Sequence, residues 1–467
     1  MPAAGAVQAL SNNMDINKLY TAFRECGSVT TDSRAIKGRE MFFGLKGENF
    51  DGNEYALKAL EAGARYAVVD EGTEAAASGN SGIIAVPDTL AALQALARHH
   101  RENTFVDGKR LTVIGLTGTN GKTTTKELIT RVLSARYRVT STQGNLNNDI
   151  GVPLSVLSIN SETQLAVIEM GANHPDDIEK LVKVCGPDYG LITNVGKAHL
   201  LGFGSFEGVK KAKGKLYDYI LEHGGSIFLN ADDPELSAMA AARKGLNVIE
   251  YGLKHSGTIV LPSDAAHPFV RMAVPSETSE DSGAETLLGL ETHLAGAYNA
   301  ANIAAAIAVG RHFGVPLEDA LQAVSEYIPK NNRSQLEKTE RNILIEDAYN
   351  ANPTSMAAAL DNLACVQAPR KAALLGDMRE LGAESVGEHR TVLEKVLSMG
   401  LDLVCLVGEE FRKALEASGE ASGSEKVKWF ASSSDLAAWL EANPQSDLTI
   451  LVKGSRGIQM EKVLPEL

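Results

Sequence analysis

Apolar, β-branched runs alternate with helix-compatible stretches along most of the chain. The run 111–116 is largely apolar, breaks into a glycine-bearing turn, and leads into the helix-compatible stretch 123–133. This order predicts a buried strand, a turn and a helix. Further alternation of the same kind predicts parallel sheets with right-handed crossover connections. The expected fold class is therefore α/β.

Three blocks of this alternation predict three domains, over residues 1–108, 109–328 and 329–467, as the length of 467 residues also suggests. The first block ends in the polar stretch His99–Thr104, which is typical of a connection. The second has a central parallel-sheet pattern, and prolines and an acidic patch at 276–285 indicate a β excursion with an exposed loop. The third has a doubly wound, Rossmann-like pattern.

Composition narrows the possible functions. The net charge of −14 argues against a general nucleic-acid or anionic-membrane binder. No apolar stretch reaches the ~20 residues of a membrane span, and the N-terminus lacks a basic-then-apolar signal pattern. The four cysteines show no metal-ligand spacing, which favours reduced thiols. We therefore expect a cytoplasmic protein without stable membrane association.

The turn after residue 117 has the features of a phosphate loop. A strand, a glycine-bearing loop and a helix N-terminus form an anion site, because backbone N–H groups and the helix dipole both favour negative charge. Lys122 would reach the β- and γ-phosphates, and the Thr123 hydroxyl would bind magnesium. The strict phosphate-loop pattern fails at one position, where Leu116 replaces glycine. A glycine-rich turn with an unrelated lysine is the alternative. The predicted nucleoside-triphosphate site comprises Gly118, Thr119, Asn120, Gly121, Lys122, Thr123 and Thr124.

Two further side chains follow predicted strands. Glu169 ends one strand and His199 follows another, and ligands of open α/β sheets bind beyond the carboxyl ends of the strands. A carboxylate and an imidazole placed there could share a metal ion, although each alone more often reflects packing or capping. The lysine-rich run 204–215 allows two interpretations as well. It is either a solvated basic helix face, or it holds a buried neutral lysine that could form a magnesium-binding carbamate.

Amides and cations in the second and third blocks complete the candidate chemistry. Asn299 and Asn302 lie three residues apart, on one helical face, and an amide can pair with adenine; N-capping is the alternative for Asn299. The stretch 346–355 places acid, phenol and amide groups in a turn after a strand, which could also be a plain Asn–Pro turn. The cations near strand ends suit phosphate or carboxylate, or are surface charges: Arg333, Lys453 and Arg456.

Together these segments resemble the Mur ligase family, the ATP-dependent amide-forming enzymes of peptidoglycan precursor synthesis. The segments that carry the resemblance are Thr117–Thr124, Glu169, Asn194–His199, Ala212–Gly214 and Gly296–Asn302. Those that resemble the member adding the D-alanyl-D-alanine dipeptide are Tyr349–Pro353, Leu375–Met378 and Lys453–Arg456. Those that resemble its uridine-nucleotide domain are Thr31–Arg34, Phe50–Asn53 and Gln143–Asn148. The Asp-Asn-Pro-Arg signature of the diaminopimelate-adding relative is absent.

The resemblance implies a reaction and a role for each domain. ATP would phosphorylate the terminal carboxylate of a UDP-linked muramoyl tripeptide, and the amine of D-Ala-D-Ala would attack the acyl phosphate. The domains would bind the UDP substrate, ATP and the dipeptide in chain order, in a monomer. The third peptide residue stays open. The catalytic residues implied are Lys122, Glu169, His199 and Lys213.

The resemblance also assigns ligands. The magnesium residues would be Thr123, Glu169, His199 and a carbamylated Lys213, and the further nucleotide residues Asn299, Asn302, Arg333 and Asp347. The substrate residues would be Ser33, Arg34, Asp51, Asn145, Asn148, Tyr349, Asn350, Asn352, Lys453 and Arg456. Asn53, Tyr298 and Lys215 depart from the family pattern, and Lys215 would supply a cation that depresses the pKa of Lys213.

Two other functions remain compatible with these motifs. One is another amide ligase of this architecture, such as a folylpolyglutamate synthase, against which the Tyr349–Pro353 signature argues. The other is a nucleotide-gated switch without ligation. A ligase should release phosphate only when both the acceptor and the dipeptide are present.

Overall fold

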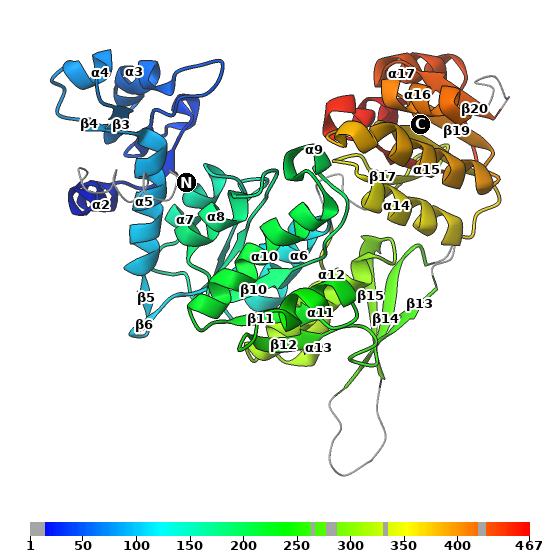
Figure 1. The fold of residues 1–467 in the computed structure, drawn as a ribbon, viewed down its shortest axis with the longest axis horizontal. Helices are drawn as coiled ribbons and strands as arrows, with labels where there is room; N and C mark the ends of the chain where they lie inside the picture. The colour runs from blue at the N-terminus through cyan, green and yellow to red at the C-terminus, as the bar shows by residue number, and fades with distance from the viewer. Residues whose placement is uncertain (1–14, 263–266, 277–286, 330–334, 419–425) are drawn as a thin grey trace, which may run out of the picture.

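The N-terminal part of the chain is organised by a four-stranded parallel sheet (Figure 1). The computed structural model describes residues 15–262, 267–276, 287–329, 335–418 and 426–467. The strands, in spatial order, are β1 (Val29–Thr30), β2 (Met41–Phe43), β3 (Tyr66–Asp70) and β4 (Ile83–Val86). The helices are α2 (Ile16–Arg24), α3 (Ala56–Glu61), α4 (Glu74–Ala77) and α5 (Thr89–Glu102), with 3-10 turns at Ser33–Ala35 and Gly52–Tyr55.

Helix α5 leaves this sheet and packs against the next domain (Figure 1). The prediction of a connection at His99–Thr104 was wrong, because α5 continues to Glu102. Its last turn is buried through polar partners of the neighbouring domain: His100 Nε2 lies 2.9 Å from the Ile159 carbonyl, and Arg101 contacts Asp188 at 2.7 Å. A polar helix end is stable here because most of its buried polar groups have a partner, although Arg101 Nη1 has no hydrogen-bond partner among the described residues.

The central domain contains a six-stranded, all-parallel sheet in the order β12-β11-β10-β7-β9-β8. Its strands are β7 (Thr112–Thr117), β8 (Val139–Ser141), β9 (Leu165–Glu169), β10 (Tyr189–Ile192), β11 (Ser226–Asn230) and β12 (Asn247–Tyr251). The helices are α6 (Lys122–Ser134), α7 (Gly151–Leu157), α8 (Asp177–Cys185), α9 (Leu200–Phe203), α10 (Phe206–Glu222), α11 (Pro234–Ala241), α12 (Asn299–His312) and α13 (Leu317–Ser325). The parallel order confirms the predicted parallel sheet, and the right-handed crossovers stay a prediction.

Two antiparallel sheets accompany the central one. Strands β5 (Phe105–Val106) and β6 (Lys109–Arg110) form a hairpin before it. Strands β13 (Ile259–Leu261), β14 (Phe269–Pro275) and β15 (Leu287–Ala295) form the predicted β excursion. Most of the acidic patch predicted as a loop lies outside the described residues.

The C-terminal domain has a six-stranded sheet in the order β16-β17-β21-β18-β19-β20, in which only β16 is antiparallel. The strands are β16 (Gln335–Lys338), β17 (Ile343–Asp347), β18 (Lys371–Gly376), β19 (Leu403–Val407), β20 (Val427–Phe430) and β21 (Thr449–Lys453). The helices are α14 (Pro353–Cys365), α15 (Ser385–Ser398), α16 (Glu409–Ser418) and α17 (Ser433–Ala442), with 3-10 turns at Gly382–Glu384, Arg456–Ile458 and Met460–Glu466. The predicted α/β class with three domains is confirmed; the domain boundaries at 108 and 328 stay predictions. Among the described helices, none is long and apolar enough to cross a bilayer.

Candidate active site

A cleft of about 1940 Å³ lies where the three domains meet. The predicted residues that line it are Thr119, Asn120, Gly121, Lys122, Thr123, Thr124, Asn145, Asn148, Glu169, His199, Asn299, Asn302, Asp347, Tyr349, Asn350, Asn352 and Lys453. Among the described residues, Ser33, Arg34, Asp51, Gly118, Lys213 and Arg456 lie outside this lining. Arg333 lies outside the described residues. The structure thus brings most of the predicted site into one space.

The turn between β7 and α6 requires its glycines. Gly121 is left-handed, with φ of 78°, and a Cβ there would lie 2.6 Å from Asn302 Oδ1. A Cβ at Gly118 would lie 1.9 Å from Thr193 Oγ1. A side chain at either position would displace a neighbour, and φ > 0 also disfavours any other residue. The loop therefore follows a tight backbone path that only glycine allows at these two positions.

Hydrogen bonds fix this loop to the segment after β10. The Thr119 and Asn120 N–H groups donate to the main-chain and side-chain oxygens of Asn194, both at 3.0 Å. The Thr193 hydroxyl donates to the Asn120 carbonyl at 2.7 Å. Lys122 Nζ curls back over the loop and donates to the Gly118 carbonyl at 3.0 Å. The ammonium group thus lies beside the anion site that the loop forms.

Glu169 is fully buried at the end of β9. Its Oε1 accepts hydrogen bonds from the Thr123 hydroxyl at 3.2 Å and from Asn147 Nδ2 at 2.7 Å. Its Oε2 is buried without a hydrogen-bond partner among the described residues. A buried carboxylate oxygen without a donor beside a threonine hydroxyl suits a hard divalent cation. Sequence analysis missed Asn147, although the asparagine-rich run around it was a signal.

His199 is the N-cap of α9, a short helix that lies beside the C-terminal domain in Figure 1. Its Nδ1 pairs with the carboxylate of Glu380, which follows β18, and the Leu201 N–H donates to the Glu380 carbonyl at 3.1 Å. Burial lowers the pKa of His199, although Glu380 acts in the opposite direction. Glu380 was not predicted, because nothing in its local sequence indicates this long-range contact.

Lys213 is the buried lysine of α10, with 2% of its surface exposed. Its Nζ lies 5.8 Å from the centroid of the Phe203 ring, and within the described part of the chain no carboxylate forms an ion pair with it. Burial, and after it the charge of Lys122, lowers the pKa of Lys213 well below its usual value. The expectation that Lys215 supplies that charge was wrong, because Lys215 pairs with Glu179 at 3.1 Å. A solvated basic face therefore does not describe Lys213.

The described residues contain no group of three or more His, Cys, Asp or Glu side chains placed to hold a metal ion. A cation beside Glu169 would therefore need other ligands as well, such as the Thr123 hydroxyl or phosphate oxygens.

Asn299 and Asn302 form a chain of hydrogen bonds below the phosphate loop. The Thr125 hydroxyl donates to Asn302 Oδ1 at 3.1 Å, and Asn302 Nδ2 donates to Asn299 Oδ1 at 2.9 Å. Asn299 Nδ2 donates to the Ala295 carbonyl at 2.7 Å. N-capping by Asn299 was wrong, because the N-cap of α12 is Tyr298.

The C-terminal domain contributes a turn after β17. Asn352 caps α14 through the Ser355 N–H at 2.9 Å, and its Nδ2 donates across the domain boundary to Asn120 Oδ1 at 2.8 Å. Lys453 is almost fully buried, forms an ion pair with Asp347, and donates to the Asn350 carbonyl at 3.1 Å.

Arg456 lies on the edge of the same region. Its guanidinium is 5.7 Å from the centroid of the Tyr349 ring. The C-terminal domain thus presents a cationic and aromatic surface next to the turn after β17.

The predicted residues of the N-terminal domain lie away from the cleft lining. The Asp32 carboxylate accepts from Arg34 Nε at 2.9 Å, in the 3-10 turn that begins at Ser33. Asp51 caps its own 3-10 turn and accepts from Asn53 Nδ2 at 2.7 Å. These contacts hold the local turns, and substrate binding by Ser33, Arg34 and Asp51 stays a prediction.

Comparisons with known proteins match this architecture. The sequence matches three family profiles, described as the Mur ligase family catalytic domain over residues 25–101, the Mur ligase middle domain over 116–310 and the Mur ligase glutamate ligase domain over 332–456. The chain belongs to the Mur ligase family. One Mur ligase relative, from Bacillus subtilis, is named UDP-N-acetylmuramoyl-tripeptide--D-alanyl-D-alanine ligase; it is 34% identical, over 94% of this chain and 92% of its own.

Solved structures of Mur ligases share this fold. MurF from Acinetobacter baumannii has a TM-score of 0.82 at 29% identity, over 97% of this chain and 98% of its own. MurF from Thermotoga maritima, in complex with ADP, has a TM-score of 0.79 at 25% identity, over 95% and 97% of the two chains.

Proposed function

We propose that the chain is an ATP-dependent ligase that joins D-alanyl-D-alanine to a UDP-N-acetylmuramoyl-tripeptide. The observation that carries the proposal is the cleft itself. It places a phosphate loop and the buried, partly unpaired Glu169 of one domain opposite the turn after β17 and Lys453 of another. Relatives with the corresponding name, at 34% identity over 94% of the chain, support the choice of substrates.

The reaction has two steps. The terminal carboxylate of the tripeptide attacks the γ-phosphate of ATP, which releases ADP and leaves an acyl phosphate. The amine of D-Ala-D-Ala then attacks the acyl carbon, the amide bond forms, and phosphate leaves with the loss of one proton from the amine. The protein has to align the reactants and neutralise the phosphate charge, which accounts for most of the catalysis in such transfers.

We assign the residues of the cleft to two roles, binding of the nucleotide and binding of magnesium. The phosphate loop would hold the triphosphate, Asn299 and Asn302 the adenine, and Asp347 and Arg333 the rest of the nucleotide. Magnesium would bind Thr123, Glu169 and His199 and neutralise phosphate charge. Its fit is supported by the unpaired Glu169 Oε2.

Lys213 would complete a second magnesium site as a carbamate. An uncharged amine reacts with carbon dioxide and loses a proton, which yields an anionic N-carboxyl group. The burial of Lys213 favours the uncharged amine that this step needs.

The substrate residues remain proposals. Ser33, Arg34, Asp51, Asn145 and Asn148 would contact the UDP-tripeptide, and Tyr349, Asn350, Asn352, Lys453 and Arg456 the dipeptide. The protein would act as a cytoplasmic monomer.

Product analysis tests this function. The protein is incubated with ATP, magnesium, D-Ala-D-Ala and either the lysine or the diaminopimelate form of the UDP-tripeptide, and the products are weighed by mass spectrometry. We expect a UDP-pentapeptide and equimolar phosphate, and neither when any one substrate is omitted. Phosphate release that is independent of the dipeptide would instead indicate a nucleotide-gated switch. In a parallel incubation with glutamate and a folate, ligation of the two would indicate the other amide ligase.

A further inference from the structure

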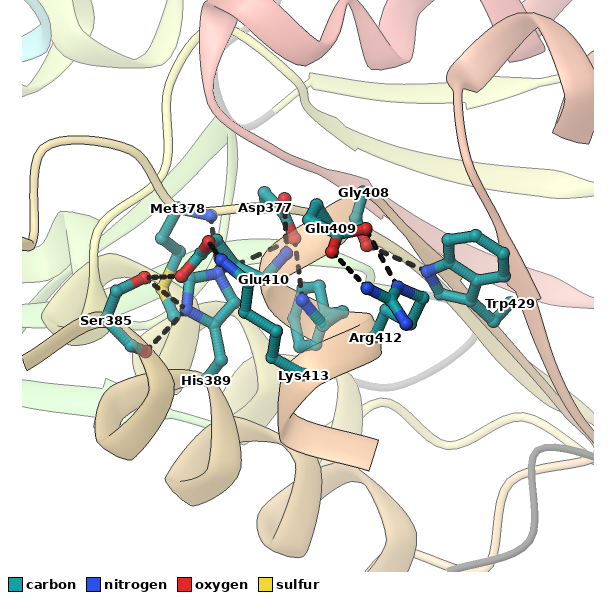
Figure 2. A network of polar contacts seen from close by, with 11 residues as sticks. Asp377, Met378, Ser385, His389, Gly408, Glu409, Glu410, Arg412, Lys413 and Trp429 are labelled. Carbon is teal, nitrogen blue, oxygen red and sulfur yellow. Dashed lines mark hydrogen bonds and ion pairs between the residues drawn. The ribbon is translucent and has the colours of Figure 1, made fainter. Parts of the chain in front are cut away.

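A buried polar network surrounds His389 in the C-terminal domain, away from the cleft lining (Figure 2). His389 lies on α15 and is fully buried. The Met378 N–H donates to His389 Nε2 at 2.9 Å, and His389 Nδ1 lies 2.7 Å from the Ser385 carbonyl. An amide N–H can only donate and a carbonyl can only accept, so the ring is neutral with its hydrogen on Nδ1. The contacts alone therefore fix the tautomer.

Asp377, the residue before Met378, is also held in place by hydrogen bonds of its side chain. Its carboxylate accepts the N–H groups of Glu410 and Phe411 at the start of α16, both at 2.9 Å. A Cβ on Gly408 would lie 2.3 Å from Asp377 Oδ2, so only glycine leaves room for this carboxylate. Trp429 Nε1 donates to the Gly408 carbonyl at 2.8 Å and holds that segment in turn (Figure 2). Two consecutive residues after β18 are thus held in place: Asp377 by hydrogen bonds of its own carboxylate, and Met378 by the His389 ring.

The anchored residues begin the 377–380 loop, which contacts the turn after β21. The Asp377 carbonyl accepts the Ser455 N–H at 3.1 Å, and the Arg379 N–H donates to Ser455 Oγ at 2.9 Å. Arg379 Nη2 also donates to the Gly457 carbonyl at 3.2 Å. Ser455 Oγ in turn donates to the Ala351 carbonyl, in the turn that precedes α14, at 3.2 Å. The loop therefore braces both C-terminal turns assigned to the dipeptide.

The far end of the same loop contacts the central domain. Glu380 pairs with His199, and its carbonyl accepts the Leu201 N–H. One four-residue segment thus joins the dipeptide turns to a residue assigned to magnesium.

We propose that His389 is a positioning residue for the ligation: by accepting the Met378 N–H it holds the 377–380 loop, and with it the turn at Ser455, in place for the dipeptide. The proposal rests on the proposed function. His389 touches no substrate and acts only through the loop.

Charge explains how the arrangement persists at neutral pH. Burial lowers the pKa of His389, which keeps the ring uncharged. Burial raises the pKa of Asp377, while the two N–H groups of α16 act in the opposite direction. Glu410, Glu388 and Asp377 are the acidic groups that face the ring, and Lys413 neutralises Glu410. A proton on Nε2 would face the Met378 N–H and break the bond that holds the loop.

Three substitutions separate the acceptor from the rest of the side chain. His389→Gln places an amide oxygen near the position of Nε2, so it keeps an acceptor for Met378. His389→Asn reaches only the position of Nδ1, and His389→Leu has no acceptor. The matched control is His100→Leu, which removes another buried helical histidine, on α5 and far from the C-terminal domain.

Steady-state ligation kinetics, thermal unfolding and the affinity for a non-hydrolysable ATP analogue are measured for all four variants. The Leu and Asn variants should lose about 10-fold in kcat/KM for the dipeptide, as expected when a buried N–H loses its acceptor. Their affinity for the ATP analogue should equal that of the parent. The Gln variant should recover most of the kcat/KM. His100→Leu should lower the unfolding temperature without changing kcat/KM for the dipeptide.

Amide hydrogen exchange at Met378 supplies a readout that does not depend on ligation. It should be slow in the parent and the Gln variant and fast in the Leu and Asn variants. A Gln variant as poor as Leu in both assays, or an equal kinetic loss in His100→Leu, would overturn the positioning role. A parent that makes no pentapeptide would refute the proposed function, while the exchange pattern would still decide whether His389 holds the loop.

Discussion

Gly121 is constrained both by its left-handed backbone and by the close approach of the Asn302 side chain. Gly108 shares only the first constraint, so the two glycines can be compared. Gly121 and Gly108 have nearly the same φ, 78° and 75°, but a Cβ on Gly121 would meet Asn302, whereas Gly108 has nothing within 4 Å. Both alanine variants should lose about 1–2 kcal/mol of unfolding free energy from left-handed strain. Only Gly121→Ala should also lower the affinity for ATP, by about 10- to 100-fold, because it displaces the Asn302 amide. Calorimetric titration with an ATP analogue and urea unfolding check both effects; equal ATP affinity in the two variants would contradict the adenine site.

The second residue-scale prediction concerns the buried lysine of α10. If Lys213 carries a carbamate, Lys213→Ala removes an anion that a small carboxylate can replace. We expect the variant to be nearly inactive in the ligation assay and partly restored by acetate or formate. Lys211→Ala, on the same helix, should be active and indifferent to either salt. A Lys213→Ala variant that no carboxylate restores, beside a parent whose mass shows no added carbon dioxide, would exclude the carbamate.

Some residues of the site could be predicted from the sequence, and others could not. Lys122 and Thr123 could be predicted, because a glycine-bearing turn between a strand and a helix has few other uses. Lys213 could be chosen among four lysines only by resemblance, since burial is a property of the folded helix. Asn147 and Glu380 were missed because each acts through a contact with a residue distant in the sequence. Their partners, Glu169 and His199, lie 22 and 181 residues away in the chain.

At the scale of elements, the end of α5 depends on one buried arginine. Arg101 donates to the Cys185 and Gly186 carbonyls at 3.1 and 3.0 Å as well as to Asp188. Arg101→Met should lower the free energy of unfolding by about 3 kcal/mol, because it leaves the Cys185 and Gly186 carbonyls without this donor and takes one buried cation from Asp188, which keeps Arg110 and the Val113 N–H as partners. Arg98→Met, one turn earlier, removes only an exposed pair with Glu102 and should stay within about 0.5 kcal/mol of the parent. Urea unfolding of both variants measures the difference. Equal losses of unfolding free energy would show that Arg101 does not stabilise the end of α5 more than an exposed arginine does.

The same helix explains the clearest error in the sequence analysis. Polar residues at His99–Thr104 indicate a loop when only neighbours along the chain are considered. In the fold, His100 and Arg101 meet acceptors from the central domain, so tertiary contacts override local polarity. Elements with apolar periodicity, such as β7 and α6, needed no such partner and were predicted within one or two residues.

For the whole molecule, the bond between Asn120 and Asn352 links two domains at the site. Asn352→Ser keeps a cap for α14 but is too short to reach Asn120, whereas Asn352→Ala loses both contacts. Both variants should lower kcat/KM for ligation by about 10-fold, because the half-buried Asn120 amide oxygen loses its donor across the domain boundary. Only the Ala variant should also lose about 1 kcal/mol of unfolding free energy. Ligation kinetics beside thermal unfolding separate the two roles, and a fully active Ser variant would show that the domains do not need this contact.

The contact between Arg101 and Asp188 also has a consequence for synthesis of the chain. The two residues are 87 positions apart, and Arg101 is made first. At about 5–20 residues per second, Asp188 follows roughly 4 to 17 s later. During that interval the last turn of α5 has neither its ion pair nor the apolar surface of the central domain. In a nascent N-terminal domain the end of α5 is therefore exposed to the ribosome surface and to chaperones, with its apolar groups uncovered and Arg101 unpaired. This exposure ends when the strand that begins at Tyr189 emerges.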